Sequence, residues 1–243
     1  MSVLGIDIGG TTIKTGFVSG YRVKDKVEIP APKSREDIVR ALKNIIAFAH
    51  ADRIGIGCPG IIDGTKVTYC PNLPLSGFDF KTLGNVVANN DAACAAWAEA
   101  QARKSKNLIC LTLGTGVGSG IVIDGKLHPA EAGHMTIDYK GKKSKCCGND
   151  GCLESLLSLD LENGTKKEKV DEFGEYLGIG ISNLVNLLRP EIIVLAGGKS
   201  KAFSKFREAM FAEIKKRALF PVKIETAKVE DAGIVGAALL TKK

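Results

Sequence analysis

Hydrophobic residues follow two spacings along this chain, and each spacing predicts a different kind of element. The runs "VLGID" at 3–7 and "IKTGFVS" at 13–19 have the length and apolar content of buried strands. Segment 35–51 instead spaces its apolar residues three and four positions apart, as one face of a helix does. The residues of that face are Ile38, Leu42, Ile45 and Phe48. The first part of the chain therefore mixes strands with helices.

The rest of the chain continues this mixture. Segment 86–104 passes from a short strand into an alanine-rich helix, and two strands joined by a glycine loop follow at 107–114 and 118–127. A long helix with apolar residues from Phe173 to Leu188 is closed by Pro190. One further strand and two helices are expected at 191–198, 204–219 and 232–241. The whole pattern predicts an α/β protein.

Two stretches, "VLGIDIGGTTIKTGFV" and "ICLTLGTGVGSGIVID", share one order of strand, glycine–threonine turn and strand. They could be two unrelated hairpins, because Gly-Gly is common in hairpin turns. However, glycines leave backbone amides open and threonines add hydroxyl donors, and such groups can hold a phosphate. We interpret the repeat as a duplicated phosphate-binding unit whose turns face each other across a cleft. Asp7, at the mouth of the first turn, suits a magnesium ion or its water shell better than a core.

The length of 243 residues fits one large domain or two modest ones, and a hydrophobic fraction of 44% allows a packed core. No stretch approaches the roughly 18 uninterrupted apolar residues of a membrane span. No signal-peptide pattern precedes the first strand. Seven cysteines, an odd number, argue against a disulfide scaffold. We therefore expect a cytoplasmic protein.

The formal net charge of +7 would fit a nucleic-acid partner. However, the basic residues are mostly lysines spread along the chain, and the aromatic residues, 6% of the total, do not interleave with them. The densest lysine runs, at 140–145 and 164–169, are expected to be solvated loops. We therefore expect neither a nucleic-acid nor a membrane partner.

Eight short motifs resemble, in the same order, those of the ROK family of sugar kinases, a branch of the actin-like ATPase superfamily. They are "DIGGTTIK", "GIGCPGIID", "PNL", "NDAACAA", "LGTGVGSGIV", "EAGH" with "CCGNDGCLE", "IIVLAGG" and "AGIVGAA". The resemblance implies two actin-like (ribonuclease H-like) α/β domains with the active site in the cleft between them. Residues 1–97 and 233–243 would form the smaller domain, and 98–232 the larger one.

The resemblance also implies ATP-dependent phosphorylation of a hexose, with magnesium. Asp91 would be the general base that takes the proton of the sugar hydroxyl. It follows a strand and begins a helix, where the helix dipole favours the ionised carboxylate. A plain helix cap is the alternative for Asp91. The residues implied to bind sugar are Gly60, Asn72, Asn90, Asp91, Glu131, His134 and Glu154. For Glu131 and Glu154, solvated surface charge is the alternative.

The implied nucleotide and magnesium residues lie in the two turns and in the adenosine motif. They are Asp7, Gly9, Gly10, Thr11, Thr12, Lys14, Gly114, Thr115, Gly116, Gly197 and Gly198. Two positions depart from the family pattern, since Ala93 replaces an asparagine and Ala196 replaces a glycine.

A zinc site is implied for His134, Cys146, Cys147 and Cys152, because tetrahedral zinc takes such ligands. The first cysteine of the family signature falls on Lys145, and Cys146 stands next to it. Adjacent cysteines point apart in extended backbone, so either Cys146 or Cys147 could be idle. The other four cysteines are expected to be small core residues; they are Cys58, Cys70, Cys94 and Cys110.

Glucose phosphorylated at its 6-hydroxyl is the expected reaction, with fructose, mannose and N-acetylated hexosamines as alternatives. The donor is expected to be ATP. Inorganic polyphosphate is the alternative donor, since Ser119 resembles members that use it and Lys199, Lys201 and Lys205 could line a positive groove. We expect a homodimer. A non-catalytic sugar-sensing regulator is the alternative from another class. The kinase fold begins at Val3, so we expect no DNA-binding helix-turn-helix before it.

Overall fold

A computed structural model describes residues 2–161 and 165–242, and the chain divides into two compact units. Unit 1 consists of residues 1–104 and 228–243, and unit 2 of residues 105–227. The boundary predicted at residue 97 would cut helix α2 (Asp91–Arg103), which the structure keeps whole inside unit 1. The two units are nearly equal in length, with the N-terminal one only slightly the shorter.

Unit 1 is built on a five-stranded sheet with the order β3-β2-β1-β4-β7. Strands β1, β2 and β3 form an antiparallel meander, whereas β1, β4 and β7 run parallel. Parallel strands end at the same edge of a sheet, so Asp7 of β1, Cys58 of β4 and Asn90 of β7 come to one edge. The strands are β1 (Val3–Ile8), β2 (Thr12–Ser19), β3 (Arg22–Pro30), β4 (Arg53–Cys58) and β7 (Val86–Asn90).

The first helix, α1 (Arg35–Ala49), begins where Ser34 accepts a hydrogen bond from the Asp37 amide. Ile38 and Leu42 of this helix are buried, as predicted. Phe48, predicted on the same face, is 87% exposed. The apolar stripe that reaches the core continues through Ala49 instead, so the helix turns Phe48 to solvent.

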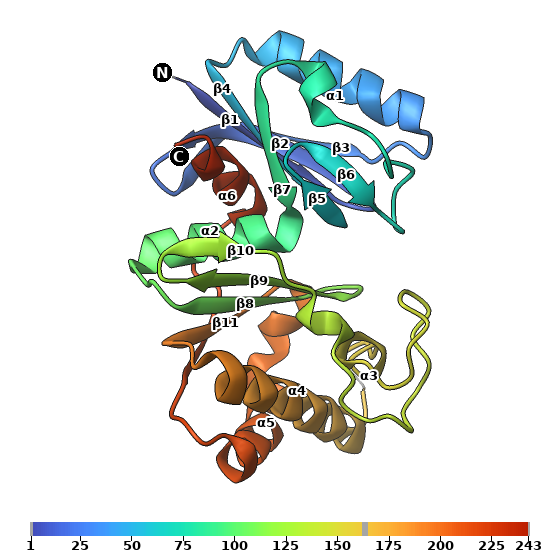
Figure 1. The fold of residues 1–243 in the computed structure, drawn as a ribbon, viewed down its shortest axis with the longest axis vertical. Helices are drawn as coiled ribbons and strands as arrows, with labels where there is room; N and C mark the ends of the chain where they lie inside the picture. Colours follow the sequence, from blue (N-terminus) through green and yellow to red (C-terminus); the bar gives the residue numbers. More distant parts are fainter. Residues whose placement is uncertain (1, 162–164, 243) are drawn as a thin grey trace. The chain divides into compact units, whose positions relative to one another are not determined.

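Helix α6 (Ala232–Leu240) packs directly on the sheet of unit 1, although it comes from the other end of the chain (Figure 1). Two strand glycines make this possible. A Cβ at Gly55 would lie 1.8 Å from the Ala237 carbonyl oxygen, and one at Gly5 would lie 2.1 Å from that of Ile234. The backbone of α6 therefore touches the backbone of β1 and β4, with no side chains between them.

Three smaller elements complete unit 1 between β4 and β7. They are the strands β5 (Ile61–Asp63) and β6 (Lys66–Tyr69) and the short 3-10 helix Phe80–Leu83. Strands β5 and β6 pair as a small antiparallel hairpin. The sequence patterns did not predict β3, β5 or β6, because these strands are short or largely exposed.

Unit 2 repeats the strand arrangement of unit 1, with the order β10-β9-β8-β11-β12. Again three antiparallel strands are followed by parallel ones on the other side of the first strand. The repeated sequence motif predicts this internal duplication, and both glycine–threonine turns join the corresponding pair of strands. The strands are β8 (Leu108–Leu113), β9 (Val117–Ile123), β10 (Lys126–His128), β11 (Ile192–Ala196) and β12 (Lys223–Thr226).

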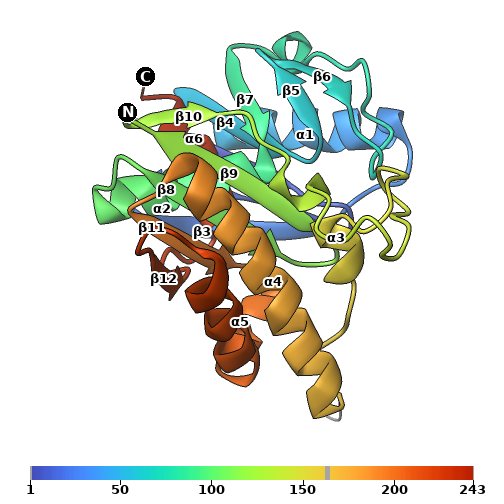
Figure 2. The ribbon, with the colours of Figure 1, turned by 60° about the horizontal axis from the view of Figure 1, so that its bottom comes forward.

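Helices α4 (Lys167–Leu188) and α5 (Phe203–Arg217) lie side by side in unit 2 (Figure 2). The short elements of the unit are α3 (Leu153–Leu156) and the 3-10 helices Ala132–His134 and Gly198–Ala202. The lysine run 140–145 is an irregular loop, as predicted. In the run 164–169, residue 164 lies outside the described residues, and the prediction of a loop is wrong from Lys167, where α4 begins. Among the described residues, no helix is long and apolar enough to cross a membrane.

Candidate functional site

Two carboxylates meet at the strand ends of unit 1. Asp7 is the last but one residue of β1, and Asp91 is the first residue of α2. Both border Gly57, where an added Cβ would lie 3.6 Å from the Asp91 Cα and 3.7 Å from Asp7 Oδ1. The Asp7 carboxylate also lies against the first turn of α6, since a Cβ at Gly233 would come within 2.5 Å of Oδ2. Small residues therefore leave the space that the two carboxylates occupy.

Both aspartates hold a proton more tightly than an ordinary carboxyl group. Burial is the main cause that raises the pKa of Asp7 to about 7; the negative charges of Asp91 and Asp231 add to this rise, and the positive charge of Lys14 opposes it. Burial also raises the pKa of Asp91. The backbone amides at the helix terminus do favour ionised Asp91, as expected, but the net pKa is raised. Its Oδ1 does accept a hydrogen bond from the Ala92 amide at 2.8 Å, but burial outweighs this bond.

Asn90, rather than Asp91, caps helix α2. Its side-chain oxygen accepts a hydrogen bond from the Ala93 amide at 3.0 Å, and its Nδ2 donates to the Gly60 carbonyl at 3.0 Å. The alternative interpretation of Asp91 as a plain helix cap is therefore not needed, because Asn90 already caps the helix. Gly60 has φ +98°, and a Cβ there would lie 2.1 Å from the Tyr69 carbonyl oxygen. Asn72 is exposed, in the segment that follows β6.

The first glycine–threonine turn lies at the same end of β1. The Gly9 amide donates to the Thr12 carbonyl at 2.8 Å, which closes the turn. Gly10 and Thr11 are exposed at its tip, and nothing lies within 4 Å of the position of a Gly10 Cβ. Lys14 faces Asp7 across the β1–β2 pair. The tip of this turn is therefore open to a ligand.

The second turn and the adenosine motif come together in unit 2. A pocket of about 500 Å³ is lined by Gly114 and Thr115 of the turn and by Gly198 and Lys199 after β11. Gly197, with φ +85°, allows this approach, because a Cβ there would lie 2.5 Å from the Leu113 carbonyl oxygen. No sequence motif pointed to the remaining part of the pocket lining. This part consists of Ser158, Leu159 and Asp160.

A smaller pocket of about 280 Å³ shares Asp160, Gly198 and Lys199 with the first and continues along Lys201 and Lys205. Lys199 donates to the Leu157 carbonyl at 2.9 Å, and burial lowers the pKa of its ammonium group. The three lysines singled out in the sequence therefore do line one groove.

Ser119, by contrast, is buried and lines neither of these pockets. It is 2% exposed, and its hydroxyl donates to the Ala130 carbonyl at 3.1 Å and accepts from the Ala132 amide at 2.8 Å. Through these two hydrogen bonds the serine holds the segment after β10 against strand β9.

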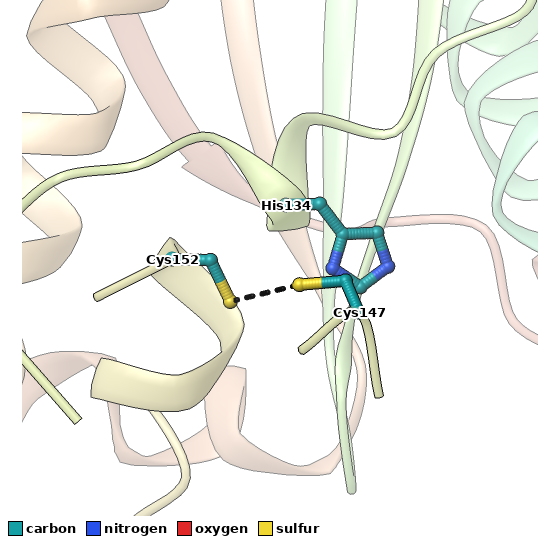
Figure 3. Close-up of side chains that lie close together, drawn as sticks. All are labelled: His134, Cys147 and Cys152. Atoms are coloured by element: carbon teal, nitrogen blue, oxygen red, sulfur yellow. Dashed lines mark hydrogen bonds between the residues drawn. The ribbon is translucent and has the colours of Figure 1, made fainter. Parts of the chain in front are cut away.

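His134, Cys147 and Cys152 point toward one another in unit 2 (Figure 3). The two sulfur atoms are 3.8 Å apart. His134 Nδ1 is buried and has no hydrogen-bond partner in the described part of the chain. Cys146 lies on the other side of the ring, with its sulfur 4.0 Å from Nε2, and forms a second group with His134 and Glu154. The neighbouring cysteines thus point into different groups.

Glu154 belongs to the second turn rather than to the open surface. Its Oε2 accepts a hydrogen bond from the Val117 amide at 2.9 Å. A Cβ at Gly116 would lie 2.3 Å from the same oxygen, so only glycine leaves room for the carboxylate. Glu131 is exposed immediately before the 3-10 helix that carries His134.

The ROK family profile matches residues 3–164 and 161–243, which together include nearly the whole chain. This chain belongs to the ROK family. The glucokinase of Halalkalibacterium halodurans is 31% identical, with 99% of this chain and 94% of that protein covered. The N-acetyl-D-glucosamine kinase of Histophilus somni is 28% identical, with 97% of each covered.

Solved structures show the same actin-like two-domain α/β fold. The ROK family glucokinase from Streptomyces griseus, in complex with glucose and AMPPNP, has a TM-score of 0.85 at 26% identity and covers 100% of this chain and 99% of its own. The inorganic polyphosphate/ATP-glucomannokinase from Arthrobacter sp. strain KM has a TM-score of 0.75 at 29% identity, with 99% and 98% covered. The predicted family and fold class are therefore confirmed.

Proposed function

We propose that this ROK protein is an ATP-dependent hexose kinase, and that glucose, phosphorylated at its 6-hydroxyl, is its main substrate. The protein is a sugar phosphotransferase, like the glucokinases to which it is similar along its full length. The observation that carries the proposal is Asp91, a carboxylate with a raised pKa that is released from capping by Asn90. Such a group is a stronger base than an ordinary aspartate, which suits proton transfer from a sugar hydroxyl.

Each neighbour of Asp91 has a role in this proposal. Asn90 and the Gly60 turn, joined by a hydrogen bond, would position the sugar hydroxyls, with Asn72 beside them. Asp7 would hold a magnesium ion through its water shell, and magnesium, when bound, neutralises charge on the transferred phosphate. Bound magnesium would also favour ionised Asp7, whose pKa of about 7 makes this group sensitive to the cation.

Unit 2 would bind the nucleotide. The open amides of the Gly114–Gly116 turn suit phosphates, and the pocket that this turn shares with Gly198 has about 500 Å³ of space. Lys199 at its wall provides a positive charge. The first turn, with exposed Gly10 and Thr11, offers a second set of amide and hydroxyl donors. Glu131, His134 and Glu154 are proposed to bind sugar hydroxyls; the two glutamates suit this because a carboxylate can accept hydrogen bonds from two hydroxyls.

We propose that zinc binds His134, Cys147 and Cys152. Two thiolates at the usual zinc–sulfur distance in tetrahedral geometry are about 3.8 Å apart, and these two sulfur atoms are 3.8 Å apart. The unpartnered Nδ1 of His134 fits a third ligand. Zinc, when bound, would supply a structural crosslink between the His134 segment and the loop that precedes α3. Cys146 belongs to the other group, so it is not among these three ligands.

Polyphosphate is the second candidate donor. The groove along Lys199, Lys201 and Lys205 extends the nucleotide pocket and carries three positive charges. A chain of phosphates without adenine would bind there mainly through charge, and its binding would weaken with salt. ATP remains the proposed main donor, because the glycine turn after β11 leaves the pocket open beside it.

A coupled assay tests the proposal. ATP and magnesium are supplied with glucose, mannose, fructose, N-acetylglucosamine or N-acetylmannosamine, and ADP release is followed. We expect the highest kcat/KM with glucose. ADP release with none of these sugars would identify a non-catalytic sugar-sensing protein instead. Polyphosphate in place of ATP, with and without added salt, decides the donor. We also propose a homodimer, which light scattering on the purified protein tests.

A further inference from the structure

Unit 2 also contains a pocket of about 420 Å³ that the proposed function does not use. Three segments of the chain enclose it: the loop 138–142, residues from the stretch 155–159 in and after α3, and the first half of α4. Its volume lies in the range of ligand sites in proteins. The pocket therefore has room for a small molecule of its own.

The charged side chains of this pocket have both signs and come from different segments. Lys140 and Lys142 belong to the loop, and Lys169 belongs to α4. Asp138 at the start of the loop and Glu172 of α4 provide the two carboxylates. A ligand in this pocket thus meets three ammonium groups and two carboxylates.

Helix α4 adds an aromatic wall beside its two charges. Lys169, Glu172, Phe173 and Tyr176 are spaced three and four positions apart, so they share one face of the helix. Phe173 is 1% exposed and Tyr176 is half-buried. Among the residues that the structure describes, none forms an ion pair with Lys169 or Glu172. Both charges are therefore available to a ligand.

Backbone contacts hold the loop 138–142 in place. The Gly151 amide donates to the Lys142 carbonyl at 2.9 Å, and the Gly141 amide donates to the Asp138 carbonyl at 2.8 Å. A Cβ at Gly141 would lie 3.0 Å from the Gly151 Cα and 2.9 Å from the Asp138 carbonyl oxygen. The loop thus lies closely against residue 151, which fixes the backbone on this side of the pocket.

We propose that this pocket binds a phosphorylated sugar. Lysine ammonium groups bind phosphate as point charges, and each carboxylate can accept hydrogen bonds from two sugar hydroxyls. The aromatic wall of α4 offers apolar surface to the carbon atoms of the ring. A sugar without phosphate would leave the lysines without an anion. ATP or polyphosphate would bring several negative charges close to Asp138 and Glu172, which repel them.

The pocket shares a wall with the nucleotide pocket, so its ligand regulates donor binding; this step rests on the proposed function. Ser158 and Leu159 line both pockets. Lys142 donates to the Ser158 hydroxyl at 3.3 Å, and Lys199 of the nucleotide pocket donates to the Leu157 carbonyl at 2.9 Å. A phosphate that draws Lys142 away from Ser158 alters this shared wall. Because a sugar phosphate is the product of the proposed reaction, the product weakens the binding of ATP.

Calorimetry tests the binding without using activity. Glucose 6-phosphate is titrated into protein that is saturated with glucose. We expect about one molecule bound per chain, with affinity lowered about 10-fold or more in Lys142→Ala and in Glu172→Gln. Lys143→Ala, at an exposed neighbour that does not line the pocket, is the matched control and should bind like wild type.

Two results would overturn the site. Equal affinity in wild type and both pocket variants would place the binding elsewhere. Inorganic phosphate that binds as tightly as glucose 6-phosphate would show that the pocket does not recognise the sugar. This comparison of variants does not require the protein to be a kinase, so it stays valid if the proposed function fails.

Kinase assays test the regulation separately. At saturating glucose, which competes with product in the active site, glucose 6-phosphate should raise the KM for ATP by about 5-fold or more. Wild type and Lys143→Ala should show this rise, and Lys142→Ala and Glu172→Gln should resist it. An equal rise in all four proteins would indicate product inhibition at the active site alone. Binding by calorimetry without any rise in wild type would refute the coupling between the two pockets.

Discussion

Asp7→Asn should make unit 1 more stable at alkaline pH. Asparagine keeps the size of the side chain and removes a charge that the fold disfavours. The pKa of Asp7 lies at about 7 instead of 3.8, and at about 1.4 kcal/mol per pKa unit this difference corresponds to about 4 kcal/mol. Because the side chain is only partly buried, solvent screening reduces the effect, and we expect about 2 kcal/mol.

The sign follows from the direction of the pKa change. A carboxyl group with a raised folded-state pKa stabilises the fold below its unfolded pKa, and this contribution is lost as pH rises from about 4 to about 7. The difference in free energy of unfolding between Asp7→Asn and wild type should therefore depend on pH. It should favour the variant by about 2 kcal/mol more at pH 8.5 than at pH 4.5. Comparing the two proteins cancels the titration of groups that they share.

Urea unfolding followed by tryptophan fluorescence measures this difference. Trp97 is the only tryptophan of the chain and lies on α2, so the signal reports on unit 1. Asp63→Asn, at an exposed end of β5, is the matched control and should track wild type at both pH values. If the free energy of unfolding depends on pH in the same way for wild type and Asp7→Asn, burial of the Asp7 carboxylate does not destabilise the fold at high pH. The variant should also lose kinase activity, a common outcome when a strained functional group is relieved.

Three further changes test the catalytic base, the zinc site and the second turn. Asp91→Asn should lower kcat by about 100-fold or more while sugar affinity stays within about 10-fold, by coupled assay and calorimetry; near-normal turnover would remove the base assignment. Elemental analysis should find about one zinc per chain, lost in Cys152→Ser but kept in Cys146→Ser; a metal-free wild type contradicts the zinc site. Gly116→Ala should displace Glu154 and raise the KM for ATP by about 10-fold or more, and an unchanged KM would show that the turn adapts.

Local patterns predicted the elements that carry the two glycine–threonine turns. The glycine–threonine repeat indicated matching strand pairs, and the structure has them in two sheets with one strand arrangement. Asp91 was placed at the start of a helix because an apolar strand and an alanine-rich run flank it, and α2 begins at this residue. Such features depend on neighbours in sequence, so pattern and spacing suffice to find them.

Features that depend on distant residues were not predictable in this way. The raised pKa of Asp91 comes from burial by the packed unit, which no local pattern reveals. Asp160 borders the same pocket as Gly198, although 38 positions separate them in the chain and no motif links them. Local spacing indicates that Cys146 and Cys147 point apart, but which of them joins Cys152 depends on the fold of the whole loop around His134. In each case three-dimensional packing outweighs sequence spacing.

The glycine contacts that seat α6 on the first sheet have a consequence for how the protein is made. The ribosome releases strands β1 to β7 long before α6, and all of unit 2 emerges in between. Unit 2 is continuous in sequence, so it can fold during synthesis, whereas the sheet of unit 1 exposes the backbone around Gly5 and Gly55 until α6 arrives. We therefore expect nascent chains to aggregate or bind chaperones mainly through the N-terminal sheet. This sheet should become protected only after α6 has been synthesised.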